Sequence, residues 1–213
     1  EKFVNDKIQL KVGDKFTLIC RANAPLGDNT QVACSYLGLV NDVKAGDTLL
    51  LDDGLMALAV SSVEGDSIYT VVLTDGALSN RKGLNRLGGG LSLGALTEQD
   101  KEHIIVAAKL EVDFLAVSFC RSAEDMHEAR RLAKEAGSRA NMVAKIERAE
   151  AIENLDEITI ASDVVMVARG DLGVEIGDAE LPGLQKKIIR TALEHNRIVI
   201  TATQMLQSMV DNP

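Results

Sequence analysis

Residues 1–86 alternate short apolar runs with turn signals. Phe16–Cys20, Leu49–Leu51, Leu55–Val60 and Ile68–Leu73 are such runs, and Gly-Asp or Asp-Gly pairs stand between them. Short apolar runs bounded by these turn residues are typical of β-strands. The first part of the chain therefore predicts a small all-β domain.

The composition changes to "NRKGLNRLGGGLSLG" between Asn80 and Gly94, and the three consecutive glycines Gly88–Gly90 predict a linker or hinge there. Beyond it, helical and strand patterns alternate. Predicted helix starts are Thr97 with Asp100, Ser122 with Asp125, and Pro182. Predicted strands are 114–119, 142–147, 164–167 and 198–203.

Four strands separated by helices predict right-handed βαβ units and a parallel sheet. Their continuous apolar runs favour strands covered on both faces. A complete (β/α)8 barrel takes about 250 residues, so the residues after the linker suffice for about half of one. We expect an α/β protein in which a small all-β barrel, residues 1–86, precedes a partial (β/α)8 TIM-type barrel, residues 87–213.

Composition narrows the possible partners. The chain has 213 residues, of which 46% are hydrophobic, so it can bury a sizeable core. Its net charge of -9 argues against general binding of nucleic acid or an anionic membrane, although a nucleotide needs only a few local cations. No apolar run approaches the roughly 18 residues that span a bilayer, so we expect no membrane association.

The three cysteines lack the spacing of a metal site or a disulfide framework, and we expect buried, reduced thiols in a cytoplasmic protein. They are Cys20, Cys34 and Cys120. The three histidines lie in predicted helices away from strand ends, which favours a solvated structural role. They are His103, His127 and His195.

Polar residues gather where the predicted parallel strands end. They are Ser118, Lys145, Glu147, Arg169, Asp171, Thr201 and Thr203. Function collects at this edge in α/β proteins. Lys145 and Glu147 are two positions apart, so they share one face of their strand. They could simply neutralise each other; the nearby Asp171 favours a functional site instead.

Glu147 and Asp171 together offer the hard oxygen ligands that suit Mg²⁺ or Mn²⁺. Lys145 would then be a cation aimed at an anionic substrate. The backbone N–H groups of Gly170 and Asp171 could begin a short helix and bind a carboxylate or phosphate oxygen. Thr203 adds a neutral hydroxyl for positioning or proton transfer. The pattern predicts a pocket for a small, multiply charged anion.

Three long segments, "MVAKIERAEAIENLDEI", "ASDVVMVARGDLGVEI" and "ITATQMLQSMVDNP", resemble successive signature segments of the pyruvate kinase family. "LLLDDGL" and "SNRKGLN" resemble the small β-barrel cap (B domain) of that family, and "KGLNRLGGGLS" resembles its bacterial members. The resemblance covers essentially the whole chain, in the family's order.

The resemblance implies phosphoryl transfer from phosphoenolpyruvate to ADP, giving pyruvate and ATP in the cytoplasm, as the last step of glycolysis. Lys145 would stabilise the transferring phosphoryl group, and Glu147 and Asp171 would ligate Mg²⁺. The N–H groups of Gly170 and Asp171 would bind the substrate carboxylate. Thr203 would contact substrate near the carbon that becomes protonated.

The resemblance also implies roles at the edge of the site. Asp53 of "DDG" and Lys82 of "RKG" would face the nucleotide when a mobile cap closes. Ser118 is a further candidate for substrate binding. Arg169 would line the edge of the site or bind a neighbouring segment, and we do not expect it to be catalytic.

The chain lacks segments that the family has. We expect a piece of a homotetrameric parent, without the family's phosphate-binding arginine, its K⁺ ligands or its effector domain, and without activity when isolated. Two alternatives remain. One is a Mg²⁺-dependent barrel aldolase or lyase acting on pyruvate enolate, which would ignore ADP. The other is a structural fragment without a working site, which would bind no Mn²⁺ through its carboxylates.

Overall fold

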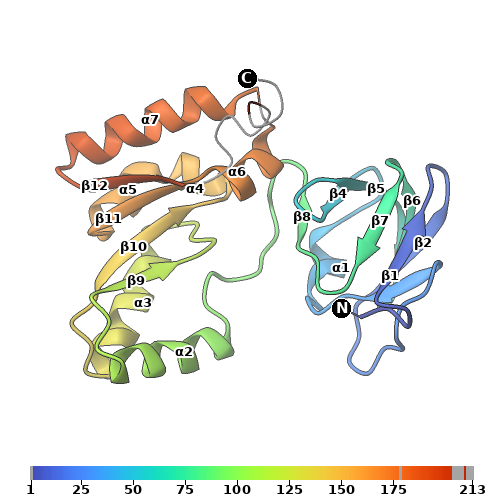
Figure 1. Cartoon of the computed structure of the whole chain (residues 1–213), viewed down its shortest axis with the longest axis horizontal. Helices are drawn as coiled ribbons and strands as arrows, with labels where there is room; N and C mark the ends of the chain where they lie inside the picture. Colours follow the sequence, from blue (N-terminus) through green and yellow to red (C-terminus); the bar gives the residue numbers. More distant parts are fainter. Residues whose placement is uncertain (1, 178, 203–208, 210–213) are drawn as a thin grey trace. The chain divides into compact units, whose positions relative to one another are not determined.

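The computed structural model describes residues 2–177, 179–202 and 209 (Figure 1). The chain divides into two compact units, Glu1–Leu93 and Gly94–Pro213, which we call the β unit and the α/β unit. This division lies a few residues after the predicted boundary between residues 86 and 87. Thr203, one of the candidate site residues, lies outside the described residues.

The described residues of the β unit, 2–93, form eight strands and one short helix. In chain order these are β1 (Lys7–Leu10), β2 (Lys15–Ile19), β3 (Gln31–Ala33), α1 (Leu39–Asp42), β4 (Thr48–Leu51), β5 (Met56–Glu64), β6 (Ser67–Val72), β7 (Gly76–Ser79) and β8 (Leu84–Arg86). Six strands form one sheet in the order β3-β2-β6-β5-β4-β8, and β1 pairs with β7. All pairings are antiparallel except that of β2 with β3.

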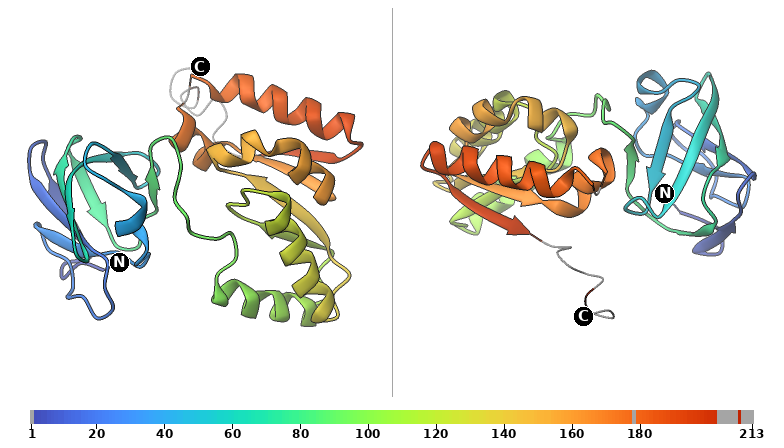
Figure 2. Two further views of the ribbon diagram at one scale, coloured as in Figure 1. Left: turned by 180° about the vertical axis from the view of Figure 1, so that it is seen from behind. Right: turned by 90° about the horizontal axis from the view of Figure 1, so that it is seen from above.

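Two-residue alternation explains the core of the β unit. In β2, Phe16 and Leu18 are buried while Lys15 is exposed. Leu58 in β5 and Ile68 in β6 are equally buried and join the same cluster. Burying each such side chain contributes about 1.5–3 kcal/mol. The strands seen in Figure 2 therefore follow from the apolar pattern of the sequence.

The three glycines after β8 form a turn that hydrogen-bonds to Arg86. Gly88, Gly89 and Gly90 all have positive φ, which only glycine adopts readily. The Arg86 guanidinium donates to the carbonyl of Gly89 (3.0 Å) and makes two bonds of 3.1 Å to Asp47. Arg86 therefore ties the glycines to the β unit, and the units divide a few residues later, at the end of the segment predicted as a linker or hinge.

The connection between the units is shorter than predicted. Leu91 packs against the core of the β unit, and Ser92 donates its N–H to Asp42 (2.7 Å). Ala95 and Leu96 pack against the core of the α/β unit. The division between the units therefore falls between Leu93 and Gly94.

The α/β unit alternates helices with parallel strands, as predicted. Its elements are α2 (Glu98–Lys109), β9 (Phe114–Val117), α3 (Ala123–Glu135), β10 (Asn141–Ile146), α4 (Ala149–Glu153), α5 (Leu155–Ala161), β11 (Val164–Ala168), α6 (Arg169–Ile176), α7 (Leu181–Glu194) and β12 (Ile198–Ala202). The sheet order is β9-β10-β11-β12, and every pairing is parallel. The predicted capping boxes of Thr97 with Asp100 and of Ser122 with Asp125 are both present.

One face of this sheet carries the helices. Figures 1 and 2 show α3, α5 and α7 along the outer side of a curved sheet, and α3 packs on β10 while α7 packs on β11 and β12. Met142, Ala144 and Ile146 alternate toward these helices and are fully buried. The arrangement is that of a partial barrel.

The opposite face is partly exposed at the two edge strands. Phe114 on β9 is 52% exposed, and Ile198 and Ile200 on β12 are 63% and 40% exposed. The prediction that all four strands are covered on both faces was therefore wrong for β9 and β12. In a closed barrel, strands from the opposite side of the barrel pack against this inner face.

Candidate active site

Lys145 and Glu147 form a close ion pair at the carboxyl end of β10. The Lys145 Nζ lies 2.6 Å from the Glu147 Oε1. The Glu147 side chain is 1% exposed and that of Lys145 is 26% exposed. The two side chains share a face of the strand, as their spacing predicts, and only the lysine reaches solvent.

Ser118 and Phe119, which follow β9, form hydrogen bonds with this pair. Ser118 accepts a hydrogen bond from the Lys145 Nζ (2.8 Å), and the Phe119 N–H donates to the Glu147 Oε2 (2.7 Å). Phe119 has φ +55°, a left-handed conformation that costs a residue with a side chain about 1–2 kcal/mol. The strained turn aims the N–H at the carboxylate. No sequence signal marked Phe119, because its role belongs to its backbone.

The pKa of Glu147 is raised, mainly because burial disfavours its charge. The bonds from Lys145 and from the Phe119 N–H oppose that effect, and the negative charge of Asp171 adds to it. The charge of Asp171 therefore acts on Glu147 as the last of these effects, and a bound cation would offset it.

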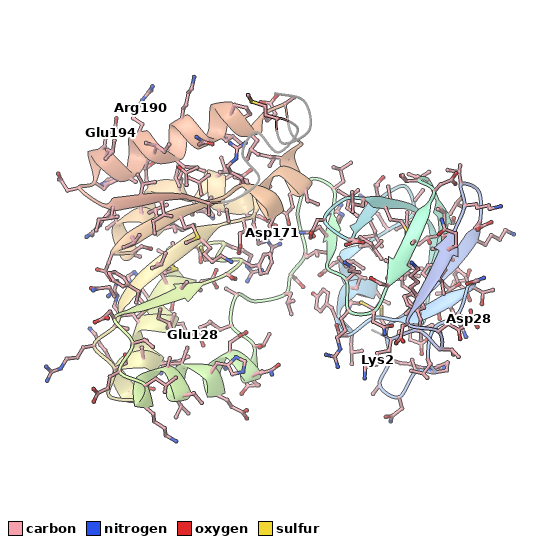
Figure 3. All side chains as sticks on the ribbon, viewed as in Figure 1. Lys2, Asp28, Glu128, Asp171, Arg190 and Glu194 are labelled. Carbon is pink, nitrogen blue, oxygen red and sulfur yellow. The ribbon has the colours of Figure 1, made fainter. Side chains whose placement is uncertain are left out.

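Asp171 and Gly170 lie in the first turn of α6, which begins directly after β11. Their N–H groups are thus among the first of the helix, which have no partner within it and carry its positive partial charge. Asp171, labelled in Figure 3, is half-buried at this end of the sheet. Arg169 bonds through its guanidinium to Gln185 of α7, so it contacts a neighbouring segment.

Two buried charged residues beneath the site were not predicted. Glu175 on α6 accepts a hydrogen bond from the N–H of Ala149, the first residue of α4 (2.9 Å). Arg148 is also buried and pairs with Glu150 (3.0 Å). They connect α6 and α4 to the strand that carries Glu147. Sequence reasoning places such residues on the surface by default, because charged side chains are rarely buried.

The donor set suits a hard divalent cation only in part. Within residues 2–177, 179–202 and 209, no group of three or more His, Cys, Asp or Glu side chains is placed to hold a metal ion. Glu147 and Asp171 supply two carboxylates, and Mg²⁺ is commonly held by one or two carboxylates with waters and substrate oxygens. The pair therefore fits a metal whose remaining ligands come from water and from a substrate.

Asp53 and Lys82 lie in the β unit, at two adjoining turns. The Lys82 Nζ pairs with Asp52 (2.8 Å), and this partner raises the pKa of Lys82. Asp52 and Asp53 both have φ +53°, and Gly54 follows at +82°. The turn therefore presents neighbouring carboxylates beside the lysine.

A family model described as the barrel domain of pyruvate kinase matches residues 1–213. The chain belongs to the pyruvate kinase family. Among curated relatives, it is 54% identical over 215 residues to the pyruvate kinase of Buchnera aphidicola subsp. Acyrthosiphon pisum, covering 100% of this chain and 45% of the relative. It is 57% identical to that of Haemophilus influenzae and 56% identical to pyruvate kinase II of Salmonella typhimurium, in each case covering 99% of this chain and 45% of the relative.

The chain therefore spans less than half the length of these pyruvate kinases. The family membership confirms the resemblance drawn from the sequence motifs and the partial-barrel fold, and it does not favour the aldolase or lyase alternative. In the part of the chain that the structure describes, no helix is both long and apolar enough to cross a bilayer.

Proposed function

We propose that the chain is part of a pyruvate kinase that transfers the phosphoryl group of phosphoenolpyruvate to ADP with the help of Mg²⁺ or Mn²⁺, giving pyruvate and ATP. The observation that carries the proposal is the Lys145–Glu147 pair, which Ser118 and Phe119 hold at the carboxyl ends of the strands, with Asp171 in the first turn of the helix that follows β11. Family membership supports it independently.

In this proposal Glu147 and Asp171 ligate the metal. Both oxygens of Glu147 already accept one hydrogen bond each, and a carboxylate oxygen has a second lone pair to offer. When bound, a divalent cation neutralises charge on the transferring phosphoryl group and orients it. Phe119 and the buried position of Glu147 keep that ligand in one orientation.

Lys145 contributes a positive charge that does not need a proton transfer to act. Its Nζ is held by Ser118 and Glu147, so its position is set before substrate binds. Such preorganised charge stabilises a developing negative charge more than a mobile lysine would. Ser118 is thus a positioning residue for Lys145 and a candidate substrate contact.

The remaining assignments belong to the same proposal. The N–H groups of Gly170 and Asp171 at the start of α6 bind the substrate carboxylate. Thr203 would contact the substrate near the carbon that is protonated. Asp53 and Lys82 would face the nucleotide when the cap closes. The parent would be a homotetramer, and its K⁺ ligands would belong to parts of the relatives that this chain does not span.

A segment exchange tests the activity. The corresponding segment of Salmonella typhimurium pyruvate kinase II, 56% identical, is replaced by this chain, and pyruvate formation is measured. We expect activity in the exchanged enzyme and a loss of about 10²–10³-fold in Lys145→Met, the range seen when one preorganised electrostatic group is removed. Lys134→Met, on the exposed side of α3, is the matched control. Equal activity of both variants would contradict the role of Lys145.

Calorimetric titration of this chain with Mn²⁺, with and without oxalate as an enolpyruvate mimic, tests the metal site directly. We expect oxalate to strengthen binding, and both Glu147→Gln and Asp171→Asn to abolish it, whereas Asp113→Asn at an exposed position leaves it unchanged. Binding that survives both substitutions would exclude these two residues as ligands. Absence of binding would support the reading of the chain as a fragment without a working site.

A further inference from the structure

Two cysteines that are distant in sequence stand on neighbouring strands of the β unit. The parallel register of β2 with β3 pairs Ile19 with Ala33, and Cys20 and Cys34 follow directly. The Cys34 N–H donates to the Ile19 carbonyl (2.8 Å), which continues the pairing. Neighbouring strands lie about 4.8 Å apart. That spacing falls within the range of about 4.4–6.8 Å between the Cα atoms of a disulfide.

The two thiols differ in access. Cys20 is 5% exposed and belongs to the core of the β unit. Cys34 is half-buried and lines a surface pocket of about 430 Å³ together with Lys2 and Arg21. A small reagent can therefore approach Cys34 through this pocket. Lys2 and Arg21 suit a reagent that carries carboxylates, and Arg21 also pairs with Asp66 (3.4 Å).

The sulfurs also interact with each other. The pKa of Cys20 is raised, first because its side chain is hydrogen-bonded to Cys34 and then because it is buried. Because Cys20 is buried and Cys34 lines the pocket, Cys34 is the sulfur that meets the reagent first and Cys20 is the resolving one. Each attacks as its thiolate, which is the nucleophile in thiol–disulfide exchange.

We propose that Cys20 and Cys34 form an oxidisable dithiol, which an anionic low-molecular-weight disulfide converts into an intramolecular disulfide. The Cys34 thiolate attacks one sulfur of the reagent, breaks its S–S bond and releases one thiolate. Cys20 then loses its proton and attacks the Cys34 sulfur, which breaks the mixed disulfide and releases the second thiolate. The two cysteines lose two electrons, the reagent gains them, and the two thiol protons end on the two released thiols.

Cys120 provides a comparison within the same chain. It is fully buried in the α/β unit, its thiol donates to the Lys145 carbonyl (3.4 Å), and burial raises its pKa to about 12. It lies in a different unit from the other two cysteines. We therefore expect Cys120 to stay a thiol under conditions that oxidise the pair.

The test incubates the reduced chain with glutathione disulfide, alkylates the remaining thiols and maps them by peptide mass spectrometry. We expect the chain to lose two hydrogen atoms in mass and two alkylatable thiols, with a Cys20–Cys34 cross-linked peptide. Cys20→Ser should instead accumulate glutathione on Cys34, because the resolving thiol is absent. Cys34→Ser should take up none, and Cys120→Ser should behave like the unsubstituted chain.

Three results would overturn the proposal: both thiols remain alkylatable, glutathione stays on Cys34 in the unsubstituted chain as it does in Cys20→Ser, or the disulfide joins two chains in a non-reducing gel. The first readout needs no substitution, so a variant that fails to fold leaves the test intact. Circular dichroism identifies any such variant.

Discussion

Glu147 keeps a charge in a buried position because two donors hold it, the Lys145 ammonium and the Phe119 N–H. Burial of a carboxylate is unfavourable unless it is paired and hydrogen-bonded. Removing one partner of a buried pair leaves the other charge uncompensated. The stability of the α/β unit and the chemistry of the site therefore depend on the same pair of side chains.

We expect Lys145→Met to destabilise the α/β unit by about 3–5 kcal/mol, because Glu147 is left buried without its cation. Adding Glu147→Gln should recover most of that loss, because a neutral amide does not need the partner. Urea unfolding followed by circular dichroism of the helices, nearly all of which lie in this unit, measures both. If the double variant were no more stable than Lys145→Met, the pair would not be coupled.

The pKa of Asp163 predicts how the stability of the α/β unit depends on pH. Its burial raises the pKa, but the Met142 N–H (2.7 Å) and the Arg130 guanidinium (2.9 Å) outweigh burial and leave the pKa below its ordinary value. A lowered folded-state pKa means that the carboxylate contributes stability above its unfolded pKa of about 3.9. That contribution is lost as the pH falls through the folded pKa.

Asp163→Asn should therefore lower the free energy of unfolding by about 1.5–3 kcal/mol at neutral pH, the value of a hydrogen bond to a charged group. The difference from the unsubstituted chain should narrow below about pH 4. Unfolding midpoints in urea across this pH range measure it, with Asp113→Asn as the exposed control. A difference that stays constant down to pH 2 would exclude the titration of Asp163 as its cause.

Sequence reasoning placed Lys145 and Glu147 together and named Ser118, but it did not find Phe119, Arg148 or Glu175 around them. Lys145 and Glu147 could be predicted because two-residue spacing at a strand end puts both on one face. Phe119 acts through its N–H, and Arg148 and Glu175 act from buried positions. None of these features is encoded in a local pattern, because each depends on which distant element lies opposite.

At the scale of the elements, the turn Gly88–Gly90 shows how a flexible composition becomes an ordered structure. All three glycines have positive φ, and the Arg86 guanidinium bonds both the turn and Asp47. Glycine allows this backbone without strain. The interactions of Arg86 give the turn its single conformation, and a composition-based prediction could not include them.

Gly88 and Gly90 form a matched pair for a test. A Cβ at Gly88 would meet nothing within 4 Å, whereas one at Gly90 would lie 2.4 Å from the Arg86 Nη1. Both alanine variants incur the left-handed strain of about 1–2 kcal/mol. Gly90→Ala should cost about 1–2 kcal/mol more, because the Arg86 Nη1 must leave the Gly89 carbonyl.

Tyrosine fluorescence during urea unfolding measures this difference, because both tyrosines, Tyr36 and Tyr69, lie in the β unit. Equal costs for the two variants would mean that Arg86 moves aside freely. In that case the hydrogen bonds of Arg86 would not stabilise the turn.

At the scale of the whole molecule, the α/β unit exposes apolar surface where a closed barrel would bury it. Phe114, Ile198 and Ile200 lie on the face without helices, and β9 and β12 are the edges of the four-stranded sheet. Exposed apolar patches and open strand edges favour association between molecules. The fold class could be predicted from the alternation of helices and strands. The exposure of this face could not, because the apolar pattern of a strand does not reveal which element packs on each of its faces.

We expect the chain to self-associate with rising concentration, and the double substitution Phe114→Lys with Ile198→Lys to shift the equilibrium towards monomer. Sedimentation velocity over a range of concentrations measures the shift. Leu110→Lys, which also removes an exposed apolar side chain but lies after α2, is the control. Association that is unchanged by the double substitution would show that another surface drives it.

The order of strands in the two sheets has a consequence for synthesis of the chain. In the α/β unit the spatial order β9-β10-β11-β12 repeats the chain order, so each strand can pair with one that has already left the ribosome. In the β unit, β1 pairs with β7, where Lys7 lies opposite Ser79, and such distant pairings form slowly. During translation the β unit therefore closes in one late step, whereas the sheet that bears Lys145 can grow strand by strand as the ribosome advances.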